Sequence, residues 1–301
     1  MEIFRSRFRA MACECELVVA ADSEAAASDC MQAAAEEVLR IETKYSRYRA
    51  DSVVGRINAA AGGQPVAIDE ETLFLLDFAA ALYTESDGLF DITSGVLRRA
   101  WRFPEPALPA AETLAELLPL VDFTAVERDG TQLRLPRPGM EIDFGGFGKE
   151  YATDRAAQVL QQRGIRHGYV NLGGDLFALG PQPDGAPWQV GISHPRQEGH
   201  LVATLPLTRG GLATSGDYER FFELDGTRYC HVLNPRTGWP VQHWQSVSVL
   251  APVCSAAGAW STIAMLKQGE ALEFLRSTGS QWLAIDATSE LYRDSDSLSA
   301  S

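Results

Sequence analysis

Near the N-terminus, hydrophobic residues recur at the spacing of amphipathic helices in two segments. An extended apolar run at 14–20 is typical of a strand, and the first helical pattern follows it, running from Ser23, which can cap the helix, to Ile41. The second pattern covers 72–83, where Asp69 can cap the N-terminus and an Asp-Gly pair follows the C-terminus. The pattern therefore predicts a strand followed by two helices.

After residue 121 the pattern changes to short apolar runs separated by turn residues. A connection rich in Pro and Ala at 104–118, leading into a short helix, precedes this change, and a helical stripe at 149–163 interrupts the runs. The Asp-Gly pair at 225–226 indicates a hairpin between two of the runs. The predicted strands are 168–171, 176–179, 188–192, 201–207, 221–224, 229–233, 246–251 and 282–287, with helices at 257–267 and 270–276.

This order of elements predicts an α+β fold, organised as a single domain of two closely joined lobes with mixed or antiparallel sheets and flanking helices. The chain has 301 residues, of which 46% are hydrophobic, so it contains enough apolar material for a large core. We see neither an internal repeat nor a clear linker. Residues 1–293 are expected to form the domain and residues 294–301 a disordered tail.

Composition narrows the classes of partner. With 26 basic and 40 acidic residues the net charge is -14, which argues against a main role on nucleic acid or an anionic membrane surface. A phosphorylated ligand would have to be held by backbone N–H groups, a few basic side chains or a metal. Arginines interrupt the N-terminal segment, no stretch has the length of a membrane span, and the five cysteines imply no disulfide framework, so we expect a cytoplasmic protein.

A glycine-rich segment at 142–154, IDFGGFGKEYATD, connects what looks like a strand end to the helix at 149–163. A helix N-terminus offers free N–H groups and partial positive charge, and glycine lets a phosphate approach the backbone. Lys149 adds a charge there. The glycine spacing matches neither the dinucleotide fingerprint nor the P-loop, and a tight turn also needs glycine, so both interpretations stay open. Asp143 would repel a phosphate and is expected to accept hydrogen bonds from a ring or to bind a metal.

Further motifs accompany this segment along the chain. They are SRYRADS at 46–52, DGLFDITSG at 87–95, VNLGGD at 170–175, ATSGDY at 213–218 and HVLNPRTG at 231–238, together with Met11, Asn58 and Trp101. In this order, over residues 11–270, these blocks resemble the FAD:protein FMN transferases, the ApbE-type flavin transferases. The resemblance implies an ApbE-like fold.

The resemblance also implies an activity. Members of that family bind FAD and Mg²⁺, transfer the FMN half to a Ser or Thr hydroxyl of a target flavoprotein, and release AMP. We therefore expect an enzyme of protein flavinylation, with FAD as its substrate, Mg²⁺ as its cofactor and a flavoprotein as its partner. Neither nucleic acid nor a membrane span is expected.

Roles of individual residues follow from the same resemblance. The glycine-rich segment is expected to lie against the flavin dinucleotide and the metal. Gly146 is expected to give its backbone carbonyl to Mg²⁺, and Thr262 its hydroxyl, which makes Thr262 a catalytic residue as well as a metal ligand. The positions expected to bind FAD are Met11, Tyr48, Leu89, Phe90, Asp91, Asp143, Lys149 and Leu233.

His231 is the candidate catalytic base. A neutral imidazole near pH 7 could accept the proton of an attacking hydroxyl, as phosphoryl transfer to an alcohol requires. The alternative is a histidine that hydrogen-bonds to the adjacent turn and holds the loop.

Tyr48 offers an aromatic face for a ring system, and Asp91 can accept hydrogen bonds from ring or ribose donors. Outside this context Tyr48 would be a half-buried surface aromatic, and Phe90 and Trp101 would be packing residues.

One position departs from the family pattern. The family completes its metal site with an Asp and a Thr four residues apart on a late helix, and here Gly258 stands where the aspartate is expected, with Thr262 in place. Mg²⁺ normally needs a carboxylate beside substrate phosphates, so its binding is expected to be weakened. Either another acid, such as Asp143 or Asp217, takes over, or the register is shifted, or the protein binds FAD without transferase activity as a carrier, sensor or redox partner. An FAD pyrophosphatase is a further alternative. If the site is simply incomplete, Gly258→Asp should restore it.

Overall fold

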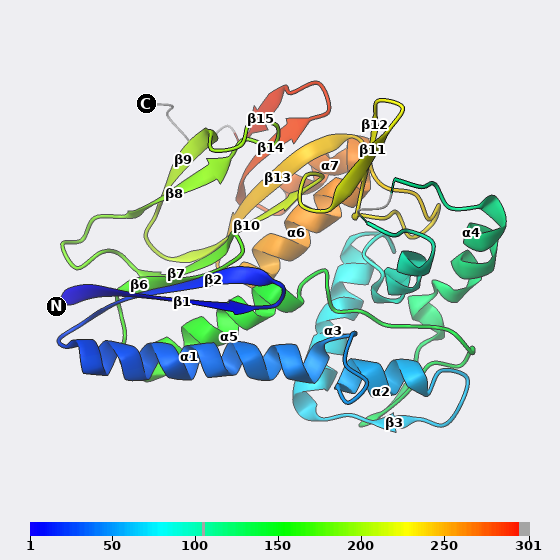
Figure 1. The fold of residues 1–301 in the computed structure, drawn as a ribbon, viewed down its shortest axis with the longest axis horizontal. Helices are drawn as coiled ribbons and strands as arrows, with labels where there is room; N and C mark the ends of the chain where they lie inside the picture. The colour runs from blue at the N-terminus through cyan, green and yellow to red at the C-terminus, as the bar shows by residue number, and fades with distance from the viewer. Residues whose placement is uncertain (104–105, 295–301) are drawn as a thin grey trace.

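The computed structural model describes residues 1–103 and 106–294 (Figure 1). Its centre is an eight-stranded sheet in the order β1-β2-β6-β7-β10-β13-β14-β15. All strand pairs in the described residues are antiparallel. The strands of this sheet are β1 (Glu2–Ala10), β2 (Cys13–Ala21), β6 (Gly168–Leu172), β7 (Asp175–Gly180), β10 (Gly210–Gly216), β13 (Trp244–Ala251), β14 (Gln281–Asp286) and β15 (Leu291–Arg293).

Helices cover one face of this sheet and a hairpin covers the other (Figure 1). Successive side chains of a strand point to opposite faces, so both faces can be apolar. Along β14, Trp282 and Ala284 belong to the core under the helices, whereas Leu283 and Ile285 belong to the core under the hairpin. The helices are α1 (Glu24–Tyr45), α5 (Gly148–Gln162), α6 (Cys254–Lys267) and α7 (Ala271–Ser277), and the hairpin strands are β8 (Trp188–Ser193) and β9 (Leu201–Leu207).

A second lobe of short elements lies beside the helices (Figure 1). Its residues share one hydrophobic core with the large sheet, because Leu75 and Phe144 belong to the same buried cluster as Val247. The two lobes therefore form one folding unit. The elements of this lobe are α2 (Val53–Ala59), α3 (Glu70–Glu85), α4 (Ala111–Leu117), the 3-10 helices η1 (Ile92–Arg99), η2 (Leu118–Leu120) and η3 (Phe123–Ala125), and a small sheet of β3 (Val66–Ala67), β5 (Gln132–Arg134) and β4 (Glu127–Asp129).

An aromatic cluster ties the second lobe to the loop after residue 231. Trp101 is buried, and its indole N–H donates to the carbonyl of Gly238 at 2.7 Å. Its ring lies 5.9 Å from that of Tyr229 and 5.3 Å from that of Trp239. Trp101 is thus a packing residue, as its size alone suggested. Tyr229 comes from a separate hairpin of β11 (Phe221–Leu224) and β12 (Thr227–Cys230).

Most predicted elements are confirmed. Ser23 and Asp69 cap α1 and α3 as expected, accepting from the N–H groups of Ala26 and Thr72. The strand predicted over 229–233 ends at Cys230. Strands β1 and β10 and helix α2 were not predicted, and the 3-10 helix η4 (Gln268–Glu270) precedes α7.

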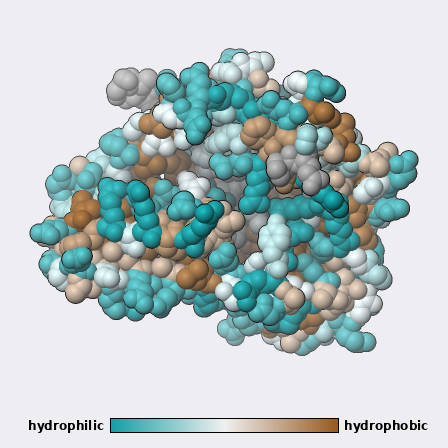
Figure 2. All heavy atoms as spheres, viewed as in Figure 1, coloured by the Kyte–Doolittle hydropathy of each residue, from teal (hydrophilic) through white to brown (hydrophobic). Residues whose placement is uncertain are grey.

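The remaining predictions concern the surface and the chain end. No helix in the described ranges has the length and apolar character needed to cross a membrane. The face shown in Figure 2 is mainly hydrophilic, with smaller hydrophobic areas between the polar side chains. Residues 295–301 of the predicted disordered tail lie outside the described residues.

Phe147 provides a test of the contact between the lobes. Its ring is fully buried, 5.2 Å from that of Phe78 on α3 and 5.4 Å from that of Phe144. Phe147→Ala should lower the free energy of unfolding by about 3–5 kcal/mol, because it leaves a cavity between the lobes. The measurement is urea denaturation, monitored by the intrinsic fluorescence of the protein. The control is Phe74→Ala at a side chain that is 58% exposed, where a change within about 0.5 kcal/mol is expected. Equal losses in both variants would contradict the central position of Phe147.

Candidate functional site

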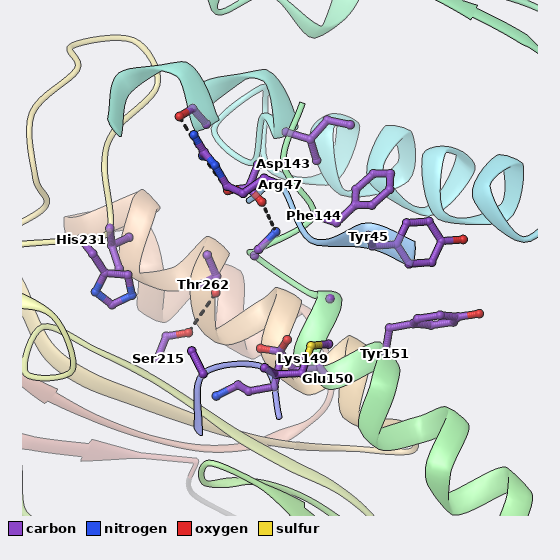
Figure 3. A pocket seen from close by; sticks show the side chains of 18 of the residues that line it. Tyr45, Arg47, Asp143, Phe144, Lys149, Glu150, Tyr151, Ser215, His231 and Thr262 are labelled. Atoms are coloured by element: carbon purple, nitrogen blue, oxygen red, sulfur yellow. Dashed lines mark hydrogen bonds and ion pairs between the residues drawn. The ribbon is translucent and has the colours of Figure 1, made fainter. Parts of the chain in front are cut away.

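A cavity of about 560 Å³ lies between the two lobes, in the size range typical of small-molecule sites. Its wall is built from the turn before β2, the segments after α1 and α3, the N-terminus of α5, strand β10, the loop after β12 and helix α6 (Figure 3). Every site residue predicted from the sequence lines it. These residues are Met11, Tyr48, Leu89, Phe90, Asp91, Asp143, Gly146, Lys149, His231, Leu233 and Thr262.

The segment before the glycines is extended but is not part of a sheet, contrary to the predicted strand end. Ile142 donates its N–H to the Asn58 side chain at 2.7 Å and accepts from the same side chain at 3.0 Å. Asp143 donates its N–H to the carbonyl of Ile92 at 2.9 Å. The side chain of Asn58 therefore replaces the hydrogen bonds of a neighbouring strand.

The glycines at this junction serve close packing. A Cβ on Gly146 would lie 2.8 Å from the ring of Phe90, well inside the ~3.5–4.0 Å at which non-bonded carbon atoms rest. At Gly145 a Cβ would lie 3.1 Å from the Asp143 carboxylate, which already accepts from the Gly145 N–H. Phe90 is buried and thus has the packing role considered for it, although it also lines the cavity.

Helix α5 begins at the cavity wall. Its first residues, from Gly148 to Glu150, line the cavity, and no side chain of the described residues caps its N-terminus. Gly148 donates its N–H to the carbonyl of Phe144 at 2.6 Å, so the remaining N–H groups of the first turn and the positive end of the helix dipole are available to an anionic group.

Asp143 is neutralised by arginine. Its carboxylate lies 3.1 Å from the guanidinium groups of both Arg47 and Arg98, and both arginines line the cavity. A carboxylate held in this way shapes the turn and is not free to replace the missing aspartate as a metal ligand. Asp217, the other acid considered for that role, is bound by Arg196 at 2.6 Å and does not line the cavity.

Lys149 is fixed at the cavity wall by a buried partner. Its ammonium lies 2.8 Å from the carboxylate of Asp175, which is 3% exposed. Burial opposes the charge of Lys149, but Asp175 raises the pKa of the ammonium above its usual value. Burial raises the pKa of Asp175, while Lys149 counteracts this. The pair places a charged lysine next to the first turn of α5.

His231 lies at another part of the wall (Figure 3). Its ring Nδ1 is buried without a hydrogen-bond partner in the described residues, whereas its backbone N–H donates to the carbonyl of Arg220 at 3.0 Å. The ring Nδ1 therefore does not hold the loop. Burial, and next the charges of Arg98 and Arg220, lower the pKa of His231 to about 4. The imidazole is therefore neutral at pH 7.

Thr262 belongs to a chain of hydroxyl groups on α6 and β10. Its Oγ1 lies 2.9 Å from that of Ser215, which lies 2.8 Å from the hydroxyl of Ser261 (Figure 3). Ser261 in turn donates to the carbonyl of Gly258 at 2.9 Å. Of this chain, Ser215 and Thr262 line the cavity, so two hydroxyl oxygens, which are hard ligands, lie at its wall.

Tyr48 and Asp91 differ in how free they are to bind a ligand. Tyr48 lies at the cavity rim, where its side chain is 78% exposed. The guanidinium of Arg47 lies 5.7 Å from the centre of its ring, and the exposed part of the ring can contact a planar ligand. Asp91 is buried, and its oxygens accept from the N–H and hydroxyl of Thr93 and from the N–H of Phe123. Asp91 therefore positions the loop that follows Phe90, and it also lines the cavity; its predicted contact with the ring or ribose of FAD stays a prediction.

Sequence reasoning missed several charged residues of the cavity. Arg47, Arg98 and Asp175 lie in or beside quoted motifs, but nothing in the sequence indicated which carboxylate each arginine neutralises.

In the described residues no group of three or more His, Cys, Asp and Glu side chains could hold a metal ion. A cation here would need ligand phosphates, backbone or hydroxyl oxygens, and a single carboxylate. Glu150 supplies a buried carboxylate oxygen, Oε2, that has no hydrogen-bond partner in the described chain.

Comparison with known proteins agrees with this architecture. The profile of the ApbE family matches residues 11–284. The chain is 32% identical over 245 residues to the FAD:protein FMN transferase of Escherichia coli K12, covering 78% of this chain and 70% of the relative. It is 34% identical over 255 residues to that of Treponema pallidum, covering 77% and 70%.

Solved structures give the same result. The crystal structure of the ApbE protein of Thermotoga maritima matches with a TM-score of 0.91 at 30% identity, covering 98% of both chains. The flavin transferase ApbE of Vibrio cholerae matches with a TM-score of 0.84 at 26% identity, covering 98% of this chain and 97% of the other.

The low pKa of His231 predicts a pH dependence of stability. The unfolded histidine takes up a proton near its ordinary pKa of 6.5, and the folded one only near 4. The contribution of the neutral ring to stability is therefore fully present above pH 6.5 and is lost as the pH falls toward 4. The difference in unfolding free energy between the wild type and His231→Gln should fall by up to about 3 kcal/mol across this window. Urea denaturation at several pH values measures it, and a constant difference would contradict the burial of the neutral ring.

Proposed function

The chain belongs to the ApbE family, and on this basis we propose that it is an FAD:protein FMN transferase, which moves FMN from FAD to a Ser or Thr hydroxyl of a target flavoprotein and releases AMP. The observation that carries the proposal is that all the residues expected to contact FAD line one cavity. We also propose a cytoplasmic site of action, which the five free cysteines favour.

In this proposal FAD is held by groups from both lobes. The exposed ring of Tyr48 stacks on the isoalloxazine or adenine ring at the cavity rim. The N–H groups at the start of α5 and the ammonium of Lys149 bind the pyrophosphate. Arg98, which shares Asp143 with Arg47, adds positive charge to the same wall. The acceptor hydroxyl enters from the side of His231.

The reaction is a displacement at the FMN-side phosphorus. The oxygen of the acceptor hydroxyl forms a bond to that phosphorus, and the bond from the phosphorus to the oxygen of AMP breaks, so AMP leaves with the electron pair. The hydroxyl proton passes to the neutral imidazole of His231. Positioning and charge neutralisation supply most of the rate enhancement in such reactions.

We propose Mg²⁺ as the cofactor. Gly146, Thr262 and Glu150 line the cavity and carry hard oxygens: a backbone carbonyl, a hydroxyl, and a carboxyl group whose Oε2 has no hydrogen-bond partner in the described residues. Such donors fit this ion. When bound, Mg²⁺ would neutralise the negative charge that develops on the pyrophosphate. The alternative of an FAD-binding protein without activity rests on Gly258 in the place of the metal-ligand aspartate, and the carboxyl group of Glu150 offers a substitute for that aspartate.

The assay that tests the proposal incubates the protein with FAD, Mg²⁺ and a candidate acceptor flavoprotein. We expect covalent flavin on the acceptor and an equal amount of AMP. AMP without flavin on any acceptor would indicate hydrolysis of FAD. FAD binding without either product would indicate a carrier and would contradict the proposal.

His231→Gln tests the base. Because glutamine cannot accept the hydroxyl proton, kcat for flavin transfer should fall by about 10²–10⁴-fold, while the Kd for FAD, measured by flavin fluorescence, should change by less than about threefold. The matched control is His243→Gln at an exposed histidine outside the cavity, which should keep the wild-type rate. A His231→Gln enzyme with the wild-type rate would exclude His231 as the base.

A further inference from the structure

Gly258 on α6 faces the side chain of Glu150 on α5. A Cβ on Gly258 would lie 2.5 Å from both Cγ and Oε1 of Glu150 and 2.7 Å from its Cδ. These distances are far shorter than the ~3.5–4.0 Å of ordinary carbon contacts. The side chain of Glu150 thus occupies the volume that any side chain at residue 258 would need.

The carboxylate of Glu150 is buried without a compensating charge of its own. Glu150 is 8% exposed and lines the cavity, and its Oε2 has no hydrogen-bond partner in the described residues. Burial, and next the charge of Asp175, raise the pKa of Glu150 above its usual value. Lys149 also faces it, but its ammonium is held by Asp175 at 2.8 Å. A buried carboxylate oxygen without a hydrogen-bond partner is costly unless a cation or a proton accompanies it.

The charged groups around Glu150 come from α5 and from β7. On its own helix these are Lys149 and Asp154, and Asp154 is occupied by the N–H groups of Cys254 and Ser255 at the start of α6. From β7 comes Asp175. Lys149 thus lies beside the carboxyl groups of both Glu150 and Asp175, and its ammonium is paired with Asp175, so ionised Glu150 needs a further positive charge, from a proton or a metal ion. A bound cation would supply it.

Oxygen donors complete the surroundings. The hydroxyl of Thr262 lies one helical turn after Gly258 on α6, in the chain of hydroxyl groups that begins at the Gly258 carbonyl. Thr262, Glu150 and Gly146 line the same cavity (Figure 3). A carboxylate oxygen among carbonyl and hydroxyl oxygens, with room for phosphates, is a ligand set that Mg²⁺ and Mn²⁺ accept.

We propose that Glu150 is the carboxylate ligand of the divalent cation in this cavity, and that residue 258 is glycine because Glu150 fills the place of its side chain. In the family pattern, the residue at position 258 on α6 supplies this carboxylate. In this chain Glu150 on α5 supplies it. This inference rests on the proposed function, since it assumes a cavity that binds FAD together with a cation. It also revises the expectation from the sequence, because Gly258→Asp alone would create a collision and would not repair the site.

The test measures cation binding without turnover. Mn²⁺ binding in the presence of saturating FAD, without acceptor, is followed by the electron paramagnetic resonance signal of free Mn²⁺. Glu150→Gln keeps the shape but removes the charge, so the Kd for Mn²⁺ should rise at least about tenfold. The matched control is Glu219→Gln, an exposed acid that also lines the cavity, for which less than about a threefold change is expected.

Two further variants test the coupling between the positions. Gly258→Asp alone should lower the urea midpoint and should not tighten Mn²⁺ binding, because Glu150 fills the space. The double variant Glu150→Gly with Gly258→Asp should recover the Kd for Mn²⁺ to within about fivefold of the wild type, since one carboxylate again faces the hydroxyl of Thr262. Recovery by the double variant also separates loss of a ligand from a folding defect in either single variant.

The outcomes separate the two proposals. If the wild type binds neither FAD nor Mn²⁺, the proposed function fails and this inference fails with it. If FAD promotes Mn²⁺ binding but Glu150→Gln leaves the Kd unchanged, the function stands and the role of Glu150 is overturned. The role is also overturned if Gly258→Asp alone is as stable as the wild type and binds Mn²⁺ more tightly.

Discussion

The buried packing of Phe147 is the constraint on which the arrangement of the cavity depends. Phe147 is the residue immediately before α5, and its ring contacts Phe78 of the second lobe and Phe144 of the preceding segment. The start of α5 is thus fixed by the lobe that faces it. Gly146 lets Phe90 close the same cluster, so the turn has little freedom to move. A helix N-terminus that is held rigidly can present its N–H groups to a ligand without reorganisation.

The positive charges of the cavity wall are each paired with a nearby carboxylate in this acidic protein. The net charge of -14 would repel a dinucleotide, yet the cavity wall carries Arg47, Arg98 and Lys149. Each of them is held by a carboxylate, Asp143 for the arginines and Asp175 for the lysine. These pairs keep the cations in fixed positions but neutralise much of their charge. In the proposed function, the helix N-terminus and a divalent ion add to the remaining positive charge of these side chains in balancing the pyrophosphate.

The sequence predicted the fold well where local signals dominate. The caps at Ser23 and Asp69 and the Asp-Gly hairpin are local, and they appear as predicted. Strand β1 was not predicted although its arginines alternate with less exposed residues, as in a half-buried strand. Strand β10 was missed because its glycines and small residues lack a strand pattern. Family motifs located the cavity residues, but the partners of Asp143 and the burial of Glu150 depend on contacts between distant segments, which no local pattern contains.

The contact between Glu150 and Gly258 has a consequence for recombining this protein with its relatives. A chimera that took α6 from a relative with aspartate at the place of Gly258, and kept α5 from this chain, would force two acidic side chains into a volume that holds one. The reverse chimera could leave that volume without any acid. The two helices should therefore be exchanged together, because a crossover point between them would separate the two residues that share this volume.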